Sequence, residues 1–180
     1  GETIVGCMGR EIKNQNKDIE FFCPETRPYL QGARLTASVL KEQGFKTTVI
    51  TDNMVAWTIS QKKIDLFTSA ADTICMDGNI VNKVGTLQIA ILCKHFGIPY
   101  FVTGIPDADK LKKDIVIEER NPNEVLEFNG LKNTLDGVEA YYPAFDITPP
   151  YLVNGVVTDK KIFSPYNLDE YYKGDVEQYY

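Results

Sequence analysis

The sequence contains few of the residues that most often carry metal or nucleophilic chemistry. Its 180 residues include one histidine and four cysteines, and no two of the cysteines have CxxC spacing. The histidine, His95, stands in CKHFG near the expected end of a helix. A cation interacts favourably with the helix dipole there, so a structural role is favoured over a catalytic one. The sequence therefore supports neither a Ser-His-Asp triad nor a metal site built from histidine and cysteine.

Long apolar runs, nucleotide-binding motifs and an excess of basic residues are also missing. No stretch approaches the roughly 20 apolar residues that span a membrane, and neither GxGxxG nor a Walker A pattern occurs. The 19 Lys and Arg residues are outnumbered by 25 Asp and Glu residues, which gives a formal net charge of -6. This balance argues against nucleic acid as a partner and predicts no membrane association, but two or three well-placed groups could still hold a small anionic ligand.

The four cysteines show no disulfide framework, which is typical of a reducing compartment and predicts a cytoplasmic protein. Cys23 and Cys93 lie in apolar runs, which predicts small buried side chains, whereas the pattern leaves Cys7 and Cys75 open. Residues 1–14 have the pattern of the end of a helix, and we expect that helix to begin in a segment that precedes Gly1.

Segments with strand and helix periodicity alternate through most of the chain. Strands are predicted over residues 19–23, 46–50, 64–69 and 98–103, and helices over 30–43, from 51 to 59 and over 81–96. A strand within 138–145, a helical turn from 148 and a strand within 153–158 follow. This alternation predicts an α/β fold with a doubly wound, mainly parallel, Rossmann-like sheet and helices on both faces, in one domain over residues 1–165. The acidic, tyrosine-rich residues 166–180 are predicted to form a tail, either poorly ordered or docked on a partner.

In a doubly wound sheet, ligands bind beyond the carboxyl ends of the strands. In the loop expected at the third of these ends, Asp72 follows a strand that we expect to be buried, and a desolvated carboxyl group with a raised pKa is suited to proton transfer. Asn82 and Lys83 stand in the first turn of the helix predicted over 81–96, where free N–H groups, the dipole and the lysine charge favour an anion such as phosphate. Each residue also has a structural alternative, since Asp72 could cap a turn and Lys83 could be a solvated helix residue.

Three stretches of the sequence, ETRPYLQGARLTA, AADTICMDGNIVNKVGT and YYPAFDITPP, occur in this order. Together they resemble the superfamily of the methylthioribose-1-phosphate isomerases, which also holds aldose-1-phosphate isomerases and the regulatory subunits of the translation initiation factor 2B exchange factor. The similarity runs from Gly1 to about Phe163. The form TRPxLQGARLTA is similar to the isomerase branch in particular.

The resemblance implies a carboxy-terminal catalytic domain of an aldose–ketose isomerase, which converts 5-methylthioribose 1-phosphate to 5-methylthioribulose 1-phosphate in methionine salvage. It implies Asp72 as the general acid or base, and Gln31, Asn82 and Lys83 as substrate contacts, with Lys83 on the phosphate. It also implies that no cofactor or metal is needed, that a catalytic cysteine lies in a segment or chain upstream of Gly1, and that the protein is a homodimer.

The same resemblance leaves alternatives open. The substrate could be another pentose 1-phosphate, such as 5-deoxyribose 1-phosphate or ribose 1,5-bisphosphate. The chain could also be a non-catalytic regulatory or sugar-phosphate-binding relative of the initiation factor 2B subunits. Those subunits typically carry glutamate where Asp72 stands, which favours the enzyme. Arg27 and Arg34 could either support the phosphate or brace their loop against Glu25 and Asp72.

Overall fold

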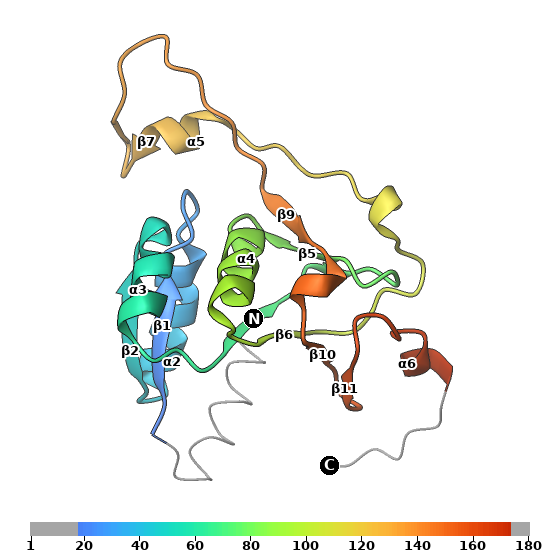
Figure 1. Cartoon of the computed structure of the whole chain (residues 1–180). Helices are drawn as coiled ribbons and strands as arrows, with labels where there is room; N and C mark the ends of the chain where they lie inside the picture. The colour runs from blue at the N-terminus through green and yellow to red at the C-terminus, as the bar shows by residue number, and fades with distance from the viewer. Residues whose placement is uncertain (1–17, 174–180) are drawn as a thin grey trace. The chain divides into compact units, whose positions relative to one another are not determined.

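The computed structural model describes residues 18–173 of the chain. The helix expected over residues 1–14, and Cys7 within it, lie outside these described residues. The chain divides into two compact units, which are described here one at a time. Unit 1 combines the described part of Gly1–Gln61 with Glu119–Tyr142, and unit 2 combines Lys62–Glu118 with the described part of Pro143–Tyr180 (Figure 1).

Unit 1 is built on a parallel pair of strands, β1 (Glu20–Pro24) and β2 (Lys46–Ile50). Between them the chain forms a π-helical segment η1 (Gly32–Ala37) that continues into α2 (Ser38–Glu42). After β2 follow η2 (Asp52–Met54) and α3 (Val55–Gln61), and the later segment adds α5 (Asn123–Leu126), β7 (Glu127–Phe128) and β8 (Leu131–Lys132). The unit therefore contains one β-α-β crossover, as the alternating sequence pattern predicts.

The core of unit 1 is small. Four side chains are buried together in it, those of Cys23, Ala37, Leu40 and Phe45. The ring of Phe21 packs edge to face against that of Phe45, with 5.3 Å between the ring centroids. These side chains come from β1, from the helical segment and from the residue just before β2, so the crossover helix is held by its apolar stripe against the strand pair.

Unit 2 holds two sheets. The first has the order β11-β10-β6-β3 and comprises β3 (Phe67–Ala70), β6 (Tyr100–Thr103), β10 (Gly155–Val157) and β11 (Ile162–Phe163). The second has the order β4-β5-β9 and comprises β4 (Thr73–Ile74), β5 (Ile80–Lys83) and β9 (Phe145–Thr148). The helical segments are α4 (Thr86–Phe96), η3 (Lys112–Asp114), η4 (Pro150–Leu152) and α6 (Glu170–Lys173).

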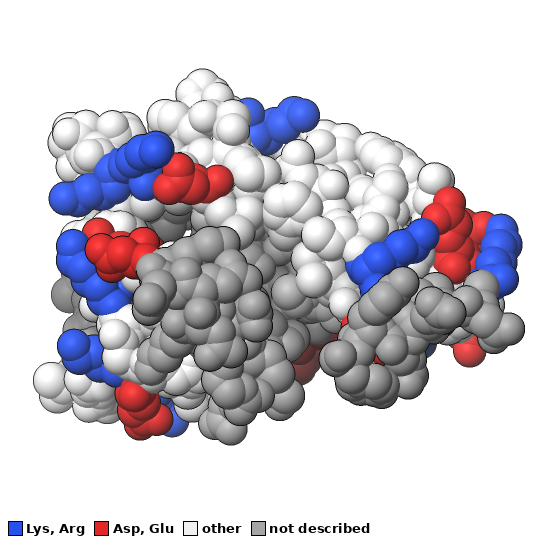
Figure 2. Space-filling model, turned by 90° about the horizontal axis from the view of Figure 1, so that it is seen from below, with Lys and Arg blue, Asp and Glu red and all other residues white. Residues whose placement is uncertain are grey.

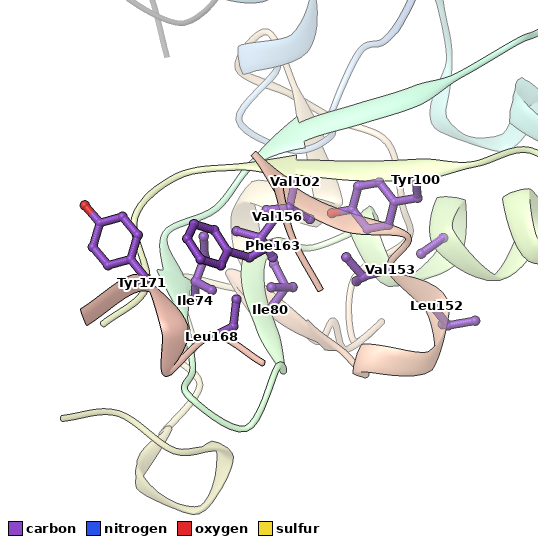
Figure 3. Packing of buried hydrophobic residues seen from close by; sticks show 11 residues of the cluster. Ile74, Ile80, Tyr100, Val102, Leu152, Val153, Val156, Phe163, Leu168 and Tyr171 are labelled. Carbon is purple, nitrogen blue, oxygen red and sulfur yellow. The ribbon is translucent and has the colours of Figure 1, made fainter. Parts of the chain in front are cut away.

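The core of unit 2 lies around β6 and β10. Val102 of β6 pairs with Val156 of β10, which in turn pairs with Phe163 of β11, and all three are buried. Figure 3 shows these side chains near the middle of the cluster, with Tyr171 and Leu152 at its two ends. The apolar run YFV at the start of β6 is typical of a strand that is covered on both faces.

The predicted fold class is confirmed at the level of a mixed α/β fold with parallel strand pairs. Strands β3, β6 and β10 are parallel, whereas β11 and the whole β4-β5-β9 sheet are antiparallel. The antiparallel sheet was not expected, because most of its central strand β5 lies in the segment 81–96, which has the apolar pattern of a helix. The doubly wound, Rossmann-like arrangement stays a prediction.

Part of the predicted acidic tail belongs to unit 2. Leu168 and Tyr171 are buried in its core. The hydroxyl of Tyr171 donates a hydrogen bond to Asp159 Oδ1 at 3.0 Å, and Lys160 Nζ donates one to the Tyr171 carbonyl at 2.9 Å. Residues up to 173 are therefore docked on their own chain, and residues 174–180 lie outside the described part.

Charged side chains of both signs are mixed on the surface. On the face seen in Figure 2, Lys and Arg side chains lie in small groups beside Asp and Glu side chains. Mixing of this kind is the ordinary pattern of a protein surface. Within residues 18–173, no helix is both long and apolar enough to cross a bilayer.

Candidate functional site

Three of the predicted site residues, Asp72, Asn82 and Lys83, lie near one end of a β-hairpin in unit 2. Strands β4 and β5 pair antiparallel, with Thr73 opposite Val81 and Ile74 opposite Ile80. The Asp72 N–H donates to the Val81 carbonyl at 2.9 Å, so Asp72 and Thr73 share Val81 at the end of this strand pair. Asn82 and Lys83 are the next two residues along β5.

The prediction that Asn82 and Lys83 lie in the first turn of a helix is wrong. Both lie on β5, which is paired on both sides, and the helix α4 begins only at Thr86. Ile80 and Val81 are β-branched and buried, as suits a central strand. Gly85, with φ 106°, makes the left-handed turn between strand and helix that other residues rarely adopt.

An aspartate already occupies the N-terminus of α4. The Asp146 carboxylate of β9 accepts the Gly85 N–H at 2.7 Å and the Leu87 N–H at 3.1 Å. Burial raises the pKa of Asp146 above its ordinary value, and the two backbone N–H groups oppose that rise. The anion site expected at this helix start is thus filled by a side chain of the protein itself.

Hydrogen bonds fix the Asn82 side chain at the same helix start. Asn82 Nδ2 donates to Thr86 Oγ1 at 3.0 Å, and the Thr86 hydroxyl donates to the Lys83 carbonyl at 2.8 Å. Asn82 also pairs with Asp146 across the sheet, so both side chains leave the same face. The neighbouring Lys83 leaves the opposite face, where its Nζ lies 4.2 Å from the centre of the Phe145 ring.

The Asp72 side chain is exposed, so the burial and desolvation predicted for it are wrong. The preceding strand β3 is half-buried along its length instead of fully buried. An exposed carboxylate can meet a ligand directly, and the backbone that carries it is paired with β5.

The loop that follows Asp72 is anchored by further carboxylates. Asp107 Oδ2 accepts the Ile74 N–H at 3.0 Å, while the Asp107 N–H donates to the Ile74 carbonyl at 2.9 Å. Asp77 Oδ2 accepts the Lys112 N–H at 3.0 Å. The turn between β4 and β5 is therefore tied to the segment that follows β6, which restrains the Asp72 end of the hairpin.

Gln31, the fourth predicted site residue, belongs to unit 1, so its relation to the hairpin stays a prediction. It directly precedes the π-helical segment η1, and its Oε1 is buried without a hydrogen-bond partner among residues 18–173. Buried polar atoms are normally paired. An unpaired amide oxygen is therefore an acceptor available to a ligand that brings a donor.

The two arginines beside Gln31 bind backbone within unit 1. Arg27 Nη2 donates to the carbonyls of Glu124, Val125 and Glu127 at 3.1 to 3.3 Å. Arg34 donates to the Tyr29 carbonyl at 3.4 Å and stacks over the Tyr29 ring. Of the two roles considered for them, bracing of the loop is supported, but the partners are carbonyl groups and not the predicted carboxylates.

Two aspartates of the structure were missed or misread by sequence reasoning. Asp146 stands within the strand FDIT. Aspartate is rare in strands, so its presence in this apolar stretch was a signal that it has a specific role. Asp52 lies at the start of the helix predicted from 51 to 59 and was not singled out, yet its carboxylate accepts the N–H groups of Thr26 and Arg27 at 2.8 and 2.7 Å. The sequence pattern around Asp52 cannot show that its hydrogen-bond partners lie in the loop after a different strand.

The described cysteines are buried, as predicted for Cys23 and Cys93. Cys75, which the sequence left open, is buried as well. Burial raises the pKa of each of the three thiols to about 11, so they are unreactive near neutral pH. Within the described chain, no group of His, Cys, Asp and Glu side chains could hold a metal ion.

Comparison with known proteins identifies the family. The model of the initiation factor 2 subunit family matches residues 3–165, and the chain belongs to this family. The methylthioribose-1-phosphate isomerase of Petrotoga mobilis is 43% identical over 167 residues, which are 91% of this chain and 48% of that protein. The chain thus spans about half the length of the curated relatives it matches.

Two solved structures have similar folds. The 5-methylthioribose 1-phosphate isomerase of Pyrococcus horikoshii superposes with a TM-score of 0.85 at 36% identity, over 94% of this chain and 49% of that one. The delta subunit of translation initiation factor eIF-2B from A. fulgidus gives a TM-score of 0.81 at 35% identity, over 87% and 46%. The resemblance drawn from the three sequence motifs is therefore confirmed.

Proposed function

We propose that this chain is the carboxy-terminal catalytic part of an aldose–ketose isomerase that converts 5-methylthioribose 1-phosphate to 5-methylthioribulose 1-phosphate. One observation carries the proposal: Asp72, Asn82 and Lys83 lie near one end of the β4–β5 pair, in a chain 43% identical to a protein of that name. An acid–base group, a hydrogen-bonding amide and a cation are the groups that a sugar phosphate needs.

The reaction requires proton transfers but no net change in composition. When the bond between C1 and the ring oxygen breaks, the oxygen must gain a proton. When C2 becomes a carbonyl carbon, its hydroxyl must lose a proton and its hydrogen passes to C1. In the proposal, Asp72 acts as general acid or base in these transfers. Asn82 and Gln31 bind sugar oxygens, and Lys83 binds the phosphate.

The whole site is proposed to include more than this chain's described residues. A cysteine in a segment upstream of Gly1, as the family resemblance implies, would be the second acid–base group. A homodimer is proposed on the same ground. The three described thiols do not fit that role, because they are buried and their pKa is about 11.

The test is a kinetic assay of the protein as its gene encodes it, with 5-methylthioribose 1-phosphate and other pentose 1-phosphates as substrates. Asp72→Asn should lower kcat by about 10² to 10⁴, the usual contribution of a general acid or base. Asp65→Asn is the matched control, since Asp65 pairs only with Lys63 at the surface of the same unit among the ion pairs described. Full activity of Asp72→Asn would remove Asp72 from the mechanism.

Lys83→Ala tests the phosphate contact separately. Removal of a charge that binds phosphate in both ground state and transition state should raise KM, and leave kcat much less affected. Lys83→Arg should keep part of the affinity because it keeps the charge. An unchanged KM in Lys83→Ala would exclude Lys83 from the site.

A second candidate is a regulatory relative that binds a sugar phosphate without turning it over. The similarity to the A. fulgidus initiation factor subunit favours it. It predicts a wild-type protein that binds the sugar phosphate in calorimetry but converts none of the pentose 1-phosphates.

A further inference from the structure

We infer that Asp52 is a positioning residue for the proposed reaction: its carboxylate holds the loop of residues 25–31 in the conformation that presents Gln31 to the substrate. The inference rests on the proposed function. It concerns unit 1 alone and depends on contacts within that unit.

The strand pairing brings Asp52 to this loop. Strands β1 and β2 are parallel and in register up to Pro24 opposite Ile50, so the chain leaves both strands at the same edge. The Glu25 N–H extends the ladder by donating to the Ile50 carbonyl at 2.8 Å. Two residues after Ile50, Asp52 is therefore next to the residues that follow β1.

Both oxygens of Asp52 are used to hold the loop. Oδ1 accepts the Thr26 N–H at 2.8 Å, and Oδ2 accepts the Arg27 N–H at 2.7 Å. Two short bonds from one carboxylate to consecutive backbone N–H groups fix the peptide plane between them. An asparagine could not replace this pair, because its amide NH₂ would face one of the two N–H donors.

The loop that Asp52 holds has an unusual backbone. Thr26 and Leu30 have φ values of 63° and 61°, which residues other than glycine rarely adopt. The following segment, Gly32–Ala37, is π-helical. Strained backbone persists only where surrounding contacts hold it, and both features are concentrated at functional sites.

Gln31 stands between the strained loop and the π-helical segment. Its buried Oε1 has no hydrogen-bond partner within the described residues. The Leu30 N–H donates to the Thr26 carbonyl at 2.7 Å, and Arg34 N–H to the Leu30 carbonyl at 2.8 Å. The position of Gln31 is thus connected, bond by bond, to the peptide that Asp52 holds.

The test is a double-mutant cycle with Asp52→Asn and Gln31→Ala in the protein as its gene encodes it. Each single variant should raise KM for 5-methylthioribose 1-phosphate by about tenfold. The double variant should raise it little further, because Asp52 acts through Gln31, whereas independent effects would multiply to about a hundredfold. Asp136→Asn is the control, since Asp136 is exposed in the same unit and pairs with Lys132. It should leave KM unchanged.

A purely structural role for Asp52 would give a different result. Such a role would lower the thermal unfolding midpoint of Asp52→Asn and leave KM unchanged at temperatures well below that midpoint, or it would give KM effects that multiply with those of Gln31→Ala. Either result for KM would overturn the inference.

Failure of the proposed function is recognised separately, by a wild-type protein that converts no pentose 1-phosphate. Amide hydrogen exchange then decides the positioning role. In Asp52→Asn, the amides of residues 26–31 should exchange at least tenfold faster than in the wild type, while those of β1 and β2 stay unchanged. Equal protection of the loop in both proteins would overturn the inference in that case too.

Discussion

At the scale of single residues, aspartate side chains serve as acceptors for backbone N–H groups of distant segments. Asp52 binds the loop after β1, Asp107 binds β4 and Asp146 binds the start of α4. Hydrogen bonds from backbone N–H groups to a carboxylate are stronger than those to a neutral acceptor. Part of the acidic excess of this chain therefore stabilises irregular backbone around the candidate site.

Gly32, the residue after Gln31, packs directly against the end of β1 and the loop that follows it. A Cβ atom there would lie 1.9 Å from the Pro24 carbonyl oxygen and 2.6 Å from Thr26 Oγ1. The carbonyl belongs to the backbone of β1 and cannot rotate away as a side chain would. Gly32→Ala should therefore destabilise the protein by about 1–3 kcal/mol, the usual cost of overpacking.

Urea unfolding measures this cost. Thr36→Ala provides the control, since Thr36 is exposed in the same helical segment and its replacement should change the free energy of unfolding by less than about 0.5 kcal/mol. Equal stability of Gly32→Ala and the wild type would show that the loop can move away from β1.

At the scale of elements, local pattern predicts those segments whose partners are near in sequence. The strand over 46–50 is found as predicted, and the helix predicted up to residue 96 does end there, with Gly97 in the left-handed conformation. Residues 81–83 were assigned to that helix because VNKVGTLQIA is apolar with helical spacing. They form a strand because β9, far away in sequence, pairs with them.

The start of α4 depends on Asp146, which takes the place of a local capping residue. Gly85 precedes the helix and has no side chain to cap it, so the carboxylate from β9 accepts the N–H groups instead. Asp146→Asn should lower stability by about 1 kcal/mol near neutral pH, as removal of a helix cap does. Asp65→Asn, in the same unit, should leave stability unchanged.

The loss caused by Asp146→Asn should depend on pH in a defined direction. Burial raises the pKa of Asp146 in the folded protein above its unfolded value of about 4. The folded state therefore binds this proton more tightly, and the associated stability is fully present below about pH 4 and is lost as the pH rises through the raised pKa. The difference between wild type and Asp146→Asn, measured by urea unfolding from pH 3 to pH 7, should decrease with rising pH. A difference that grows with pH would contradict the assigned cause.

At the scale of the whole chain, the candidate residues are divided between two compact units, and the sequence indicates their roles to different degrees. Asp72, Asn82 and Lys83 were singled out by their expected loop and helix positions as well as by the family resemblance, and the structure places them near one end of the β4–β5 pair in unit 2. Their proximity could not have been derived from their spacing in the sequence alone, because the pairing of β4 with β5 depends on hydrogen bonds between strands. Gln31 was assigned through the family resemblance alone. The left-handed residues of its loop were not predicted, and the anchoring role of Asp52 required the parallel pairing of β1 with β2.

The two units should differ in their resistance to local unfolding. Unit 2 has a larger buried cluster than unit 1, and its strand β6 has a paired neighbour on each side. In unit 1, β1 and β2 have only each other among the described strands. Because protection against amide exchange follows burial and pairing, β6 and β10 should exchange more slowly than β1 and β2.

A pair of matched core variants shows whether the units open independently. Leu40→Ala in unit 1 and Val102→Ala in unit 2 each remove buried methyl groups, and Leu→Ala replacements of this kind cost about 2–5 kcal/mol. Leu40→Ala should speed exchange in β1 and β2 while β6 keeps its protection, since opening of a small core need not open a larger one. Val102→Ala should lower the protection of β6 and β10. Equal loss of protection in all four strands from either variant would show that the chain unfolds as one cooperative body, and that the loop carrying Gln31 is as stable as the core of unit 2.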